Sequence, residues 1–493
     1  MPSASLRLAV VGAGAAGLVA ARELRREGHA PVVFERAAAV GGTWLYTPPA
    51  TSSDPLGAAA THSSLYASLR TNLPRETMGF LDFPFAAGAA GSRDPRRFPG
   101  HEEVLRYLEA FARRFDLLRL VRFETEVLSV RREDGGRWAV TSRKLGDKGS
   151  GEEEFYDAVV VCNGHYTEPR LAVIPVINSY TYRTSTGVDA WPGKQMHSHN
   201  YRVPEPFLDQ VVIIIGASAS AVDISRDIAS MAEEIWKLLS TGGAATVSVV
   251  ANLMLGLQID HAQEDGTVVF QDGSSIKADV IMHCTGYSDL QYHLHPVSYK
   301  SMPFCVNLES DNVLLAFVCC LATCMTFHSL EMTALSPWMT TVSIHYTSIF
   351  FHPKWHLICP SSDCLGKSVL LQIDAPVIPF PLFELQSKWV ARVLSGRINL
   401  PSEDRMMEDV KAFYLKLEAH GWPKRYTHNF ANYQFEYDDW LAEQCGHPPV
   451  EEWRKQMYAV TSMNKAARPE SYRDEWDDEH LVAEANEYFK KFL

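Results

Sequence analysis

The stretch LRLAVVGAGAAGLVAARELRREGHAPVVFE, residues 6–35, joins an apolar run to a glycine turn, a helical pattern and a second apolar run. Gly12, Gly14 and Gly17 lie in and just after the turn, and Glu35 closes the second run. In a dinucleotide-binding βαβ unit the first glycine permits a tight turn, the second lets the backbone approach a pyrophosphate, and the third lets helix and strand approach. The helix N-terminus offers free N–H groups to the phosphates, and Glu35 is placed to accept from ribose hydroxyls. The stretch therefore predicts a nucleotide-binding α/β domain.

A second stretch, DQVVIIIGASASAVDISRDIA at 209–229, restarts the same strand–turn–helix pattern. Gly216 keeps the first glycine, whereas Ser218 and Ala221 replace the second and third. The signal is weak alone, but after one complete fingerprint it predicts a second nucleotide site, with two dinucleotides whose rings meet. A G-x-S-x-G nucleophile elbow is the alternative, and Ser220 stands where that motif needs glycine.

Composition narrows the class of protein. The chain has 493 residues, enough for two or three domains, and 46% of them are hydrophobic. Its 46 basic and 59 acidic residues give a net charge of -13, which would repel a nucleic-acid backbone or an anionic membrane. Nine cysteines without a C-x-x-C pair argue against a zinc ribbon or a redox dithiol. We expect a reducing, cytoplasmic location and no nucleic-acid or membrane partner.

The remaining chain alternates predicted elements. We expect a helix at 101–115, a hairpin at 121–143, strands at 157–164 and 278–287, and a largely helical C-terminal third that includes 408–421. The acidic run DEWDDE at 474–479 is interpreted as a solvated surface.

Residues 288–374 differ from their surroundings, because they contain nine charged residues in 87 and six of the nine cysteines. No caps, period or turn chemistry organise them, so we predict a poorly ordered segment. The uncharged run Asn312–Leu330 is marginal for a membrane span, which needs about 20 apolar residues. His352, His356, Cys359 and Cys364 have zinc-like spacing, but Pro353 disfavours a helical pairing of the histidines, and no metal is expected.

Several separated motifs resemble the flavin-containing monooxygenases. They are GAGAAG with GGTW (41–44), LRTNLPRE (69–76) with DFPF (82–85), WPGKQMHSHNYRVP (191–204) and HCTGY (283–287). The closest likeness is to plant S-oxygenating members of the kind that act on glucosinolate thioethers. The family's identifying pattern maps onto Trp191, Gly193, His197 and Tyr201, with Trp in place of the usual Phe. Tyr201 speaks against Baeyer–Villiger enzymes, which usually have Trp there, whereas the auxin-forming branch stays open.

The resemblance implies a reaction. NADPH reduces FAD, O2 adds to the flavin to give a hydroperoxyflavin, and a soft nucleophile, a thioether sulfur or an amine, takes the distal oxygen. Asn72 matches the family's asparagine and is the catalytic candidate, because its amide can donate to a peroxide oxygen and accept from a carboxamide N–H. A plain turn residue before Pro74 is the alternative. His197 is expected to be structural. The cofactor-binding candidates are Gly12, Gly14, Gly17, Glu35, Gly42, Trp44, Asn72, Gly216, Ser218, Ala221, Thr285 and Gly286.

The predicted architecture is α/β, with two Rossmann-like dinucleotide-binding domains, the flavin domain being discontinuous and interrupted by the nicotinamide domain. The expected divisions are 1–187 for FAD, 188–287 for NADP, the atypical 288–374, and 375–493 returning to the FAD domain with C-terminal helices. Because 288–374 replaces the family's own segment, a catalytically impaired FAD- and NADP-binding homologue is the alternative. A flavoprotein reductase would normally show a dithiol near the first helix, and none is present.

The residues after the second glycine turn bear on the choice between NADPH and NADH. The strand after the second glycine turn is expected at 245–250, and no Lys or Arg stands between Lys237 and Lys277 to meet a 2′-phosphate. No acidic residue at 250–253 favours a free ribose hydroxyl either. The sequence therefore predicts only a weak preference for NADPH over NADH.

Overall fold

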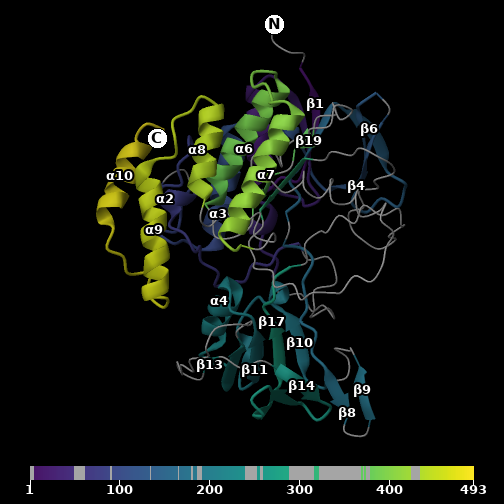
Figure 1. Cartoon of the computed structure of the whole chain (residues 1–493), viewed down its shortest axis with the longest axis vertical. Helices are drawn as coiled ribbons and strands as arrows, with labels where there is room; N and C mark the ends of the chain where they lie inside the picture. The colour runs from purple at the N-terminus through teal and green to yellow at the C-terminus, as the bar shows by residue number, and fades with distance from the viewer. Residues whose placement is uncertain are drawn as a thin grey trace. The chain divides into compact units, whose positions relative to one another are not determined.

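A computed structural model describes residues 5–48, 62–88, 91–133, 135–164, 166–178, 181–185, 191–238, 253–255, 259–287, 316–320, 368–369, 371–373, 378–422 and 433–492. The chain forms two compact units (Figure 1). Unit 1 comprises Met1–Trp44, Arg70–Gly164 and Tyr292–Leu493, and unit 2 comprises Leu45–Leu69 and His165–Gln291. Unit 1 is thus discontinuous in sequence. The domain divisions expected from sequence stay a prediction.

The central sheet of unit 1 is built around the first glycine turn. Strand β1 (Arg7–Val11), helix α1 (Ala15–Arg26) and strand β2 (Ala30–Phe34) follow the predicted order. The sheet runs β20-β18-β7-β1-β2-β3, with β19 also paired to β7, and all its pairings are parallel. Its other strands are β3 (Val121–Arg122), β7 (Ala158–Val161), β18 (Ala316–Cys320), β19 (Ser368–Val369) and β20 (Leu371–Ile373). The parallel βαβ prediction is confirmed.

Alternation along β1 divides the core of unit 1 into two layers. Leu8 and Val10 belong to a cluster with helices α1, α3 (His101–Arg114) and α6 (Pro379–Leu394). Ala9 and Val11 belong to a second cluster on the opposite face. That face meets an antiparallel sheet of β4 (Thr125–Arg132), β5 (Trp138–Lys144) and β6 (Glu152–Tyr156). Since successive strand residues point to opposite faces, one apolar strand serves both layers.

Unit 2 repeats this plan. Its parallel sheet runs β10-β17-β11-β12-β13. Helix α4 (Ala219–Ile228) contributes Ile224 and Ile228 to one apolar cluster, and a second sheet, β16-β15-β14-β8-β9, contributes Val268 and Phe270 to another. The bounds are β8 (Val176–Asn178), β9 (Thr181–Ser185), β10 (Lys194–His197), β11 (Val211–Ile215), β12 (Glu234–Leu238), β13 (Leu253–Leu255), β14 (Ile259–Gln263), β15 (Thr267–Phe270), β16 (Ser275–Lys277) and β17 (Val280–His283).

One strand prediction in unit 2 is wrong. The strand that follows the second glycine turn and its helix is β12, at Glu234–Leu238, not residues 245–250, which lie outside the described residues. Strand β12 pairs parallel with β11 along its whole length, with Ile215 opposite Leu238. The sequence does not indicate this strand, because polar Glu234 and Lys237 interrupt the apolar run that is typical of a buried strand. Lys237 is nevertheless buried in the sheet.

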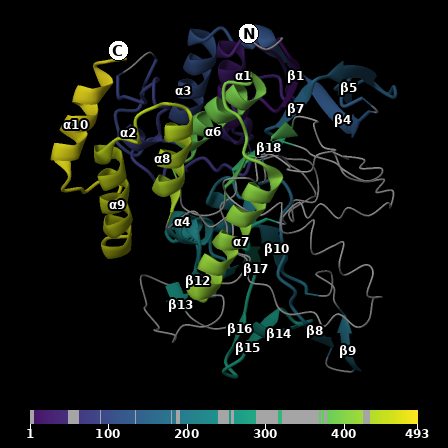
Figure 2. The same ribbon diagram turned by 45° about the horizontal axis from the view of Figure 1, so that its top comes forward.

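The C-terminal third is helical, as predicted. Its helices are α6, α7 (Glu403–Ala419), α8 (Gln434–Gln444), α9 (Glu452–Ala467) and α10 (Glu479–Phe489). Helices α9 and α10 lie side by side (Figures 1 and 2). Buried Arg454 of α9 donates to the carbonyls of Glu76, Thr77 and Gly79, and thereby fastens the short helix α2 (Arg75–Met78). Single 3-10 turns are η1 (Gly42–Trp44), η2 (Leu118–Leu120), η4 (Ser198–Asn200) and η5 (Glu205–Phe207).

Within 288–374 the structure describes three strands, β18 (Ala316–Cys320), β19 (Ser368–Val369) and β20 (Leu371–Ile373), at one side of the unit 1 sheet. The rest of this segment, including most of 312–330 and all four zinc-like positions, lies outside the described residues. Among the described helices, none has the length and apolar character needed to cross a bilayer. The described part of the chain also holds no group of His, Cys, Asp and Glu suited to a metal ion.

The acidic run 474–479 is more than the solvated surface that its sequence indicates. Asp478 is buried, and its carboxylate accepts hydrogen bonds from the two terminal guanidinium nitrogens of Arg97, at 2.5 and 2.7 Å. The Asp474 carboxylate accepts hydrogen bonds from the two terminal guanidinium nitrogens of Arg70, at 2.9 and 2.8 Å. Only part of the run is simply hydrated, because two of its carboxylates bind arginines far away in sequence.

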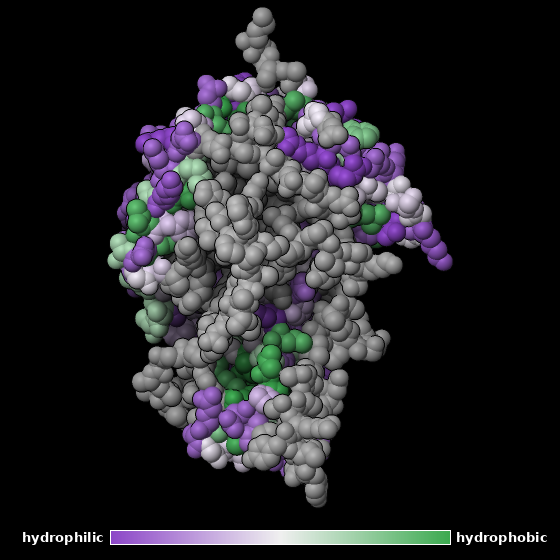
Figure 3. Space-filling view, turned by 45° about the vertical axis from the view of Figure 1, so that its right-hand side comes forward, coloured by the Kyte–Doolittle hydropathy of each residue, from purple (hydrophilic) through white to green (hydrophobic). Residues whose placement is uncertain are grey.

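The exposed surface of the described residues is mixed in polarity. On the face in Figure 3 hydrophilic residues cover most of the described surface of the upper part, and apolar ones gather mainly in a patch lower in the view. The large apolar side chains that are exposed are scattered in sequence: Leu118, Leu145, Phe155, Val173, Leu208, Leu415, Met463 and Phe492. Isolated exposed apolar residues of this kind are normal for globular proteins.

A buried acid between α6 and α8 gives a prediction about stability. Asp438 is almost fully buried; its Oδ2 accepts from Gln434 Nε2 at 3.0 Å, and its Oδ1 has no partner among the described residues. Burial raises the pKa of Asp438 well above its ordinary value. The free energy of unfolding therefore falls as pH rises from the ordinary pKa towards the raised one, since ionisation is easier in the unfolded chain.

We expect Asp438→Asn to raise the thermal midpoint by a few degrees at about pH 8 and by less at about pH 5, because the amide carries no charge to bury. Glu436→Gln, on the exposed side of the same helix, is the control. Thermal unfolding followed by circular dichroism measures both. Equal midpoints for Asp438→Asn and the parent chain at every pH would contradict the prediction.

Candidate functional site

The first glycine turn is shaped by the protein's own backbone. Gly12 has φ +103°, and a Cβ there would lie 2.4 Å from the carbonyl oxygen of Cys162. A Cβ on Gly17 would lie 1.9 Å from the carbonyl oxygen of Gly12. Both positions therefore need glycine for the turn to close, whether or not a ligand is bound.

Gly14 is different, because the protein leaves room beside it. A Cβ at Gly14 would meet nothing closer than Gly42 Cα, at 3.5 Å, which is an ordinary contact. Gly42 begins η1 with φ +57°, and Gly41 N–H donates to Ala13 O at 3.0 Å, so the GGTW loop returns to the glycine turn. Gly14 also caps α1 without a side-chain hydrogen bond, and the first turn of α1 has no acidic residue. Bare backbone and free N–H groups fit a pyrophosphate.

Glu35 stands at the far end of β2, where the fingerprint expects it. Its Oε2 accepts from Ala13 N–H and its Oε1 from Ala37 N–H, both at 2.7 Å. Burial raises the pKa of Glu35, while these backbone donors oppose that rise. Each oxygen keeps further acceptor capacity, so the carboxylate can accept from ribose hydroxyls and hold the glycine turn at the same time. Trp44 lies beside this turn and packs, partly buried, against the unit 1 core.

The second glycine turn copies the first in its backbone. Gly216 has φ +125°, and a Cβ there would lie 2.3 Å from the carbonyl oxygen of Cys284, as at Gly12 and Cys162. Ser218 is exposed and caps α4 without a side-chain hydrogen bond, and Ala221 is fully buried. An open helix N-terminus of this kind also fits a pyrophosphate.

The register of the strands shows what replaces Glu35 in unit 2. Gly12 N–H donates to Phe34 O, and Glu35 follows Phe34; Gly216 N–H donates to Leu238 O, at 3.2 Å. In the sequence Leu239 follows Leu238 as Glu35 follows Phe34, and the Leu239 side chain has no atom that accepts a hydrogen bond. Leu239 itself lies outside the described residues. A site that prefers NADH usually has a carboxylate at this position.

Thr285 and Gly286 hold their own loop in place. The Thr285 hydroxyl donates to Arg170 O, and Arg170 Nε donates to Thr285 O at 3.1 Å. Gly286 has φ +76°, and its carbonyl accepts from Arg170 N–H at 3.0 Å. These contacts position the turn after β17, and a cofactor contact at these two residues stays a prediction.

The identifying pattern lies in the interior of unit 2. A Cβ on Gly193 would lie 2.1 Å from the Trp191 ring, which explains glycine after that aromatic residue. Tyr201 OH donates to Asp227 at 2.5 Å. His197 is fully buried, and its Nδ1 accepts from His199 N–H at 3.0 Å. Burial lowers the pKa of His197 to about 3, so its ring is neutral at physiological pH. This supports the structural role predicted for His197.

Asn72 lies between two tight anchors in unit 1. Thr71 N–H donates to Pro99 O at 2.9 Å, and Arg75 N–H donates to Arg97 O at 2.9 Å. The Asn72 Oδ1 accepts from Arg473 NH2 at 2.5 Å and from Tyr472 OH at 3.2 Å. Because a guanidinium only donates, the carbonyl side of the amide must face Arg473. Both acceptor positions of Oδ1 are thus used, and the predicted acceptance from a carboxamide N–H would have to displace one of these donors.

Sequence reasoning missed Tyr472 and Arg473. They lie 400 and 401 positions from Asn72, in a turn that reads as charged surface. No local pattern in a single sequence indicates a contact over that separation.

Comparisons with known proteins agree with the motifs. The family model "Flavin-binding monooxygenase-like" matches residues 5–255. "Flavin-containing monooxygenase FMO GS-OX-like 2" of Arabidopsis thaliana is 48% identical over 100% of this chain and 96% of its own length. The solved S-allyl-L-cysteine S-oxygenase of Allium sativum is 49% identical, covers 100% of both chains and has a TM-score of 0.79. Tmm of Pelagibacter sp. strain HTCC7211, 20% identical over 95% of this chain and 93% of its own, shares the fold with a TM-score of 0.68.

Proposed function

Since the chain belongs to the flavin-binding monooxygenase-like family and is a flavin-dependent monooxygenase with FAD and NADP as cofactors, we propose that it oxygenates a thioether sulfur of a small molecule. The observation that carries this substrate class is its 49% identity, over the full length of both chains, with the S-allyl-L-cysteine S-oxygenase of Allium sativum. The resemblance to this family is confirmed. The alternative of an impaired homologue finds no support in these comparisons, since relatives align over the whole chain.

Each part of the site has a task in that reaction. When bound, FAD reduced by NADPH supplies the activation of O2 and the transfer of one oxygen atom, while the other leaves as water. The bare backbone at Gly14 and Gly42 would hold the FAD diphosphate, and Glu35 would hold its ribose. Asn72 would offer its amide N–H2 as a fixed hydrogen-bond donor to the oxygen atom on which charge develops during the transfer.

The nicotinamide site is proposed at the second glycine turn, with Gly216, Ser218 and Ala221 against the NADP diphosphate. Neither a carboxylate nor an arginine directly follows β12, whose next residues are Leu239, Ser240 and Thr241. Serine and threonine hydroxyls hold a 2′-phosphate less firmly than a bidentate guanidinium does. The weak preference predicted from the sequence therefore stands, although the strand on which it was based is different.

We expect NADPH to be preferred over NADH by about tenfold or less, roughly 1.4 kcal/mol. Stopped-flow reduction of the bound flavin by each nucleotide measures this ratio. Leu239→Glu should shift the ratio towards NADH, because its carboxylate accepts from a free 2′-hydroxyl and repels a phosphate. A hundredfold preference for NADPH in the parent chain would show that a cation outside this segment recognises the phosphate.

The substrate class is tested with S-allyl-L-cysteine as thioether and a tertiary amine of similar size. We expect sulfoxide formation in step with NADPH oxidation, and 18O from 18O2 in the sulfoxide by mass spectrometry. Oxygenation of the amine alone would overturn the thioether proposal while leaving the monooxygenase class intact. A sulfoxide without 18O would contradict oxygen transfer itself.

A cytoplasmic location is part of the same proposal. In the described part of the chain Cys162, Cys284 and Cys445 are buried, and none of the three forms a disulfide. Burial raises the pKa of Cys284 to about 12 and that of Cys445 to about 11, so both stay as unreactive thiols. Free thiols of this kind suit a reducing compartment.

A further inference from the structure

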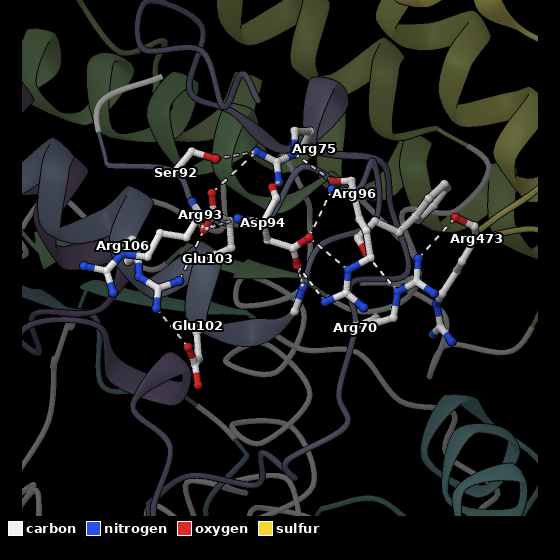
Figure 4. Close-up of polar contacts among 12 residues, drawn as sticks. Arg70, Arg75, Ser92, Arg93, Asp94, Arg96, Glu102, Glu103, Arg106 and Arg473 are labelled. Carbon is white, nitrogen blue, oxygen red and sulfur yellow. Dashed lines mark hydrogen bonds and ion pairs between the residues drawn. The ribbon is translucent and has the colours of Figure 1, made fainter. Parts of the chain in front are cut away.

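The turn at Tyr472–Asp478, between α9 and α10, is fastened to the segment that carries Asn72. Arg70 binds Asp474 with two nitrogens and donates to Arg473 O at 3.2 Å. Arg97 binds buried Asp478 with two nitrogens. Figure 4 shows Arg70 and Arg473 with one dashed contact between them, the hydrogen bond from Arg70 to Arg473 O. Paired arginine–carboxylate contacts fix orientation as well as distance.

The 70–103 segment that receives this turn is itself held by a polar cluster. Arg75 donates to the carbonyls of Asp94 and Arg96, at 2.5 and 3.1 Å, and faces Glu103 at 3.6 Å (Figure 4). The Asp94 carboxylate accepts from Gly100 N–H at 2.9 Å. Hydrogen bonds from Arg96 and Gly100 outweigh burial and hold the pKa of Asp94 well below its usual value. The Asn72 loop thus has a rigid support on one side and the C-terminal turn on the other.

Two side chains of the C-terminal turn reach the Asn72 amide itself. Arg473 donates to Oδ1 with NH2 and to Thr71 O with Nε, at 2.5 and 3.1 Å, and Tyr472 donates to Oδ1 with its hydroxyl at 3.2 Å. Tyr472 is buried and its ring meets Phe98 edge-on. Among the described residues none accepts a hydrogen bond from Asn72 Nδ2, and the Asn72 side chain is only half-buried. Its two N–H donors are therefore the free side of the amide.

We propose that Tyr472 and Arg473 are positioning residues for the monooxygenase reaction: they hold Asn72 Oδ1 so that the amide presents its N–H2, and no free acceptor, to the bound cofactors. Without them the amide could rotate by a half-turn and present its carbonyl oxygen, which repels an electron-rich oxygen atom. This inference deepens the proposed function and rests on the catalytic role proposed for Asn72.

The test compares two variants that loosen the same turn. Arg473→Met removes one of the two donors to Asn72 Oδ1. Arg70→Met removes the Asp474 pair and the hydrogen bond to Arg473 O, and takes no donor from the Asn72 amide. For Arg473→Met we expect several-fold more H2O2 released per NADPH, with flavin reduction by NADPH changed less than about twofold. Arg70→Met should stay coupled like the parent enzyme, and Arg473→Lys, which keeps one cationic donor, should recover part of the coupling.

A spectrum of the resting enzyme distinguishes a change in the surroundings of the flavin from a loss of protein stability. Visible circular dichroism of the oxidised holoenzyme reports the groups around the flavin ring. We expect Arg473→Met and Asn72→Ala to change this spectrum in the same sense, and Arg70→Met to keep the parent spectrum even if its thermal midpoint falls. Equal spectra and equal coupling for Arg473→Met and Arg70→Met would overturn the positioning role. Full coupling in Asn72→Ala would instead overturn the catalytic role of Asn72, so the two failures are distinguishable.

Discussion

Gly14→Val is expected to abolish flavin binding while the polypeptide still folds. A Cβ at this position meets only Gly42, with Cα at 3.5 Å and N at 3.9 Å, which are ordinary contacts, so the protein itself does not require glycine there. The added side chain instead occupies the space through which the backbone approaches a pyrophosphate. We expect the purified variant to be colourless, with far-ultraviolet circular dichroism like that of the parent chain, and its apoprotein to lose at least about 100-fold in FAD affinity by fluorescence titration, about 2.7 kcal/mol.

Two other glycines are controls that make this prediction specific. Gly17→Ala places a Cβ 1.9 Å from Gly12 O, so it should reduce folded, soluble protein rather than flavin affinity alone. Gly149→Ala, where a Cβ meets nothing within 4 Å, should change neither. If Gly14→Val retained flavin at the parent stoichiometry, the assignment of the first turn to FAD would be wrong.

The three glycines show why sequence predicted this part of the site well. Gly12 is required by its own φ of +103°, and Gly17 by the carbonyl of Gly12 in the same turn, so both requirements are visible as a motif. Gly216, with φ +125°, repeats the first of these requirements. Motifs of this kind record backbone geometry, which is local, and local geometry is what a single sequence reports best.

Strand β12 and the C-terminal turn show where such reasoning fails. Residues 245–250 have the more strand-like composition, yet β11 pairs with Glu234–Leu238, because tertiary pairing outweighs the intrinsic preference of a short segment. Asp478 reads as hydrated, yet it is buried against Arg97, 381 positions away. Whether a charge meets solvent or a distant partner depends on the fold and not on its neighbours in sequence.

Asn72→Asp is expected to uncouple NADPH oxidation from oxygenation without destabilising the protein. The carboxylate keeps the contacts of Oδ1 with Arg473 and Tyr472. It turns the hydrogen bond that the Arg473 guanidinium donates to a neutral amide into an ion pair. The thermal midpoint should therefore equal or exceed that of the parent chain. The oxygen that replaces the amide nitrogen cannot donate, and loss of one such donor typically costs about 100-fold or more in rate. NADPH use should then yield mainly H2O2, measured against product by parallel assays.

An unchanged or higher thermal midpoint together with lost coupling in Asn72→Asp would exclude the view of Asn72 as only a turn residue. If the side chain mattered solely for the turn before Pro74, a substitution that preserves or strengthens its contacts would preserve coupling as well. Thr71→Val is the matched control, because Thr71 Oγ1 donates to Leu73 O at 2.8 Å and its loss loosens the same turn without touching the amide. A coupled Asn72→Asp beside an uncoupled Thr71→Val would assign the effect to the turn. An uncoupled, stable Asn72→Asp beside a coupled Thr71→Val assigns it to the N–H donors, because the two side chains share the turn and differ in what they present to the cofactors.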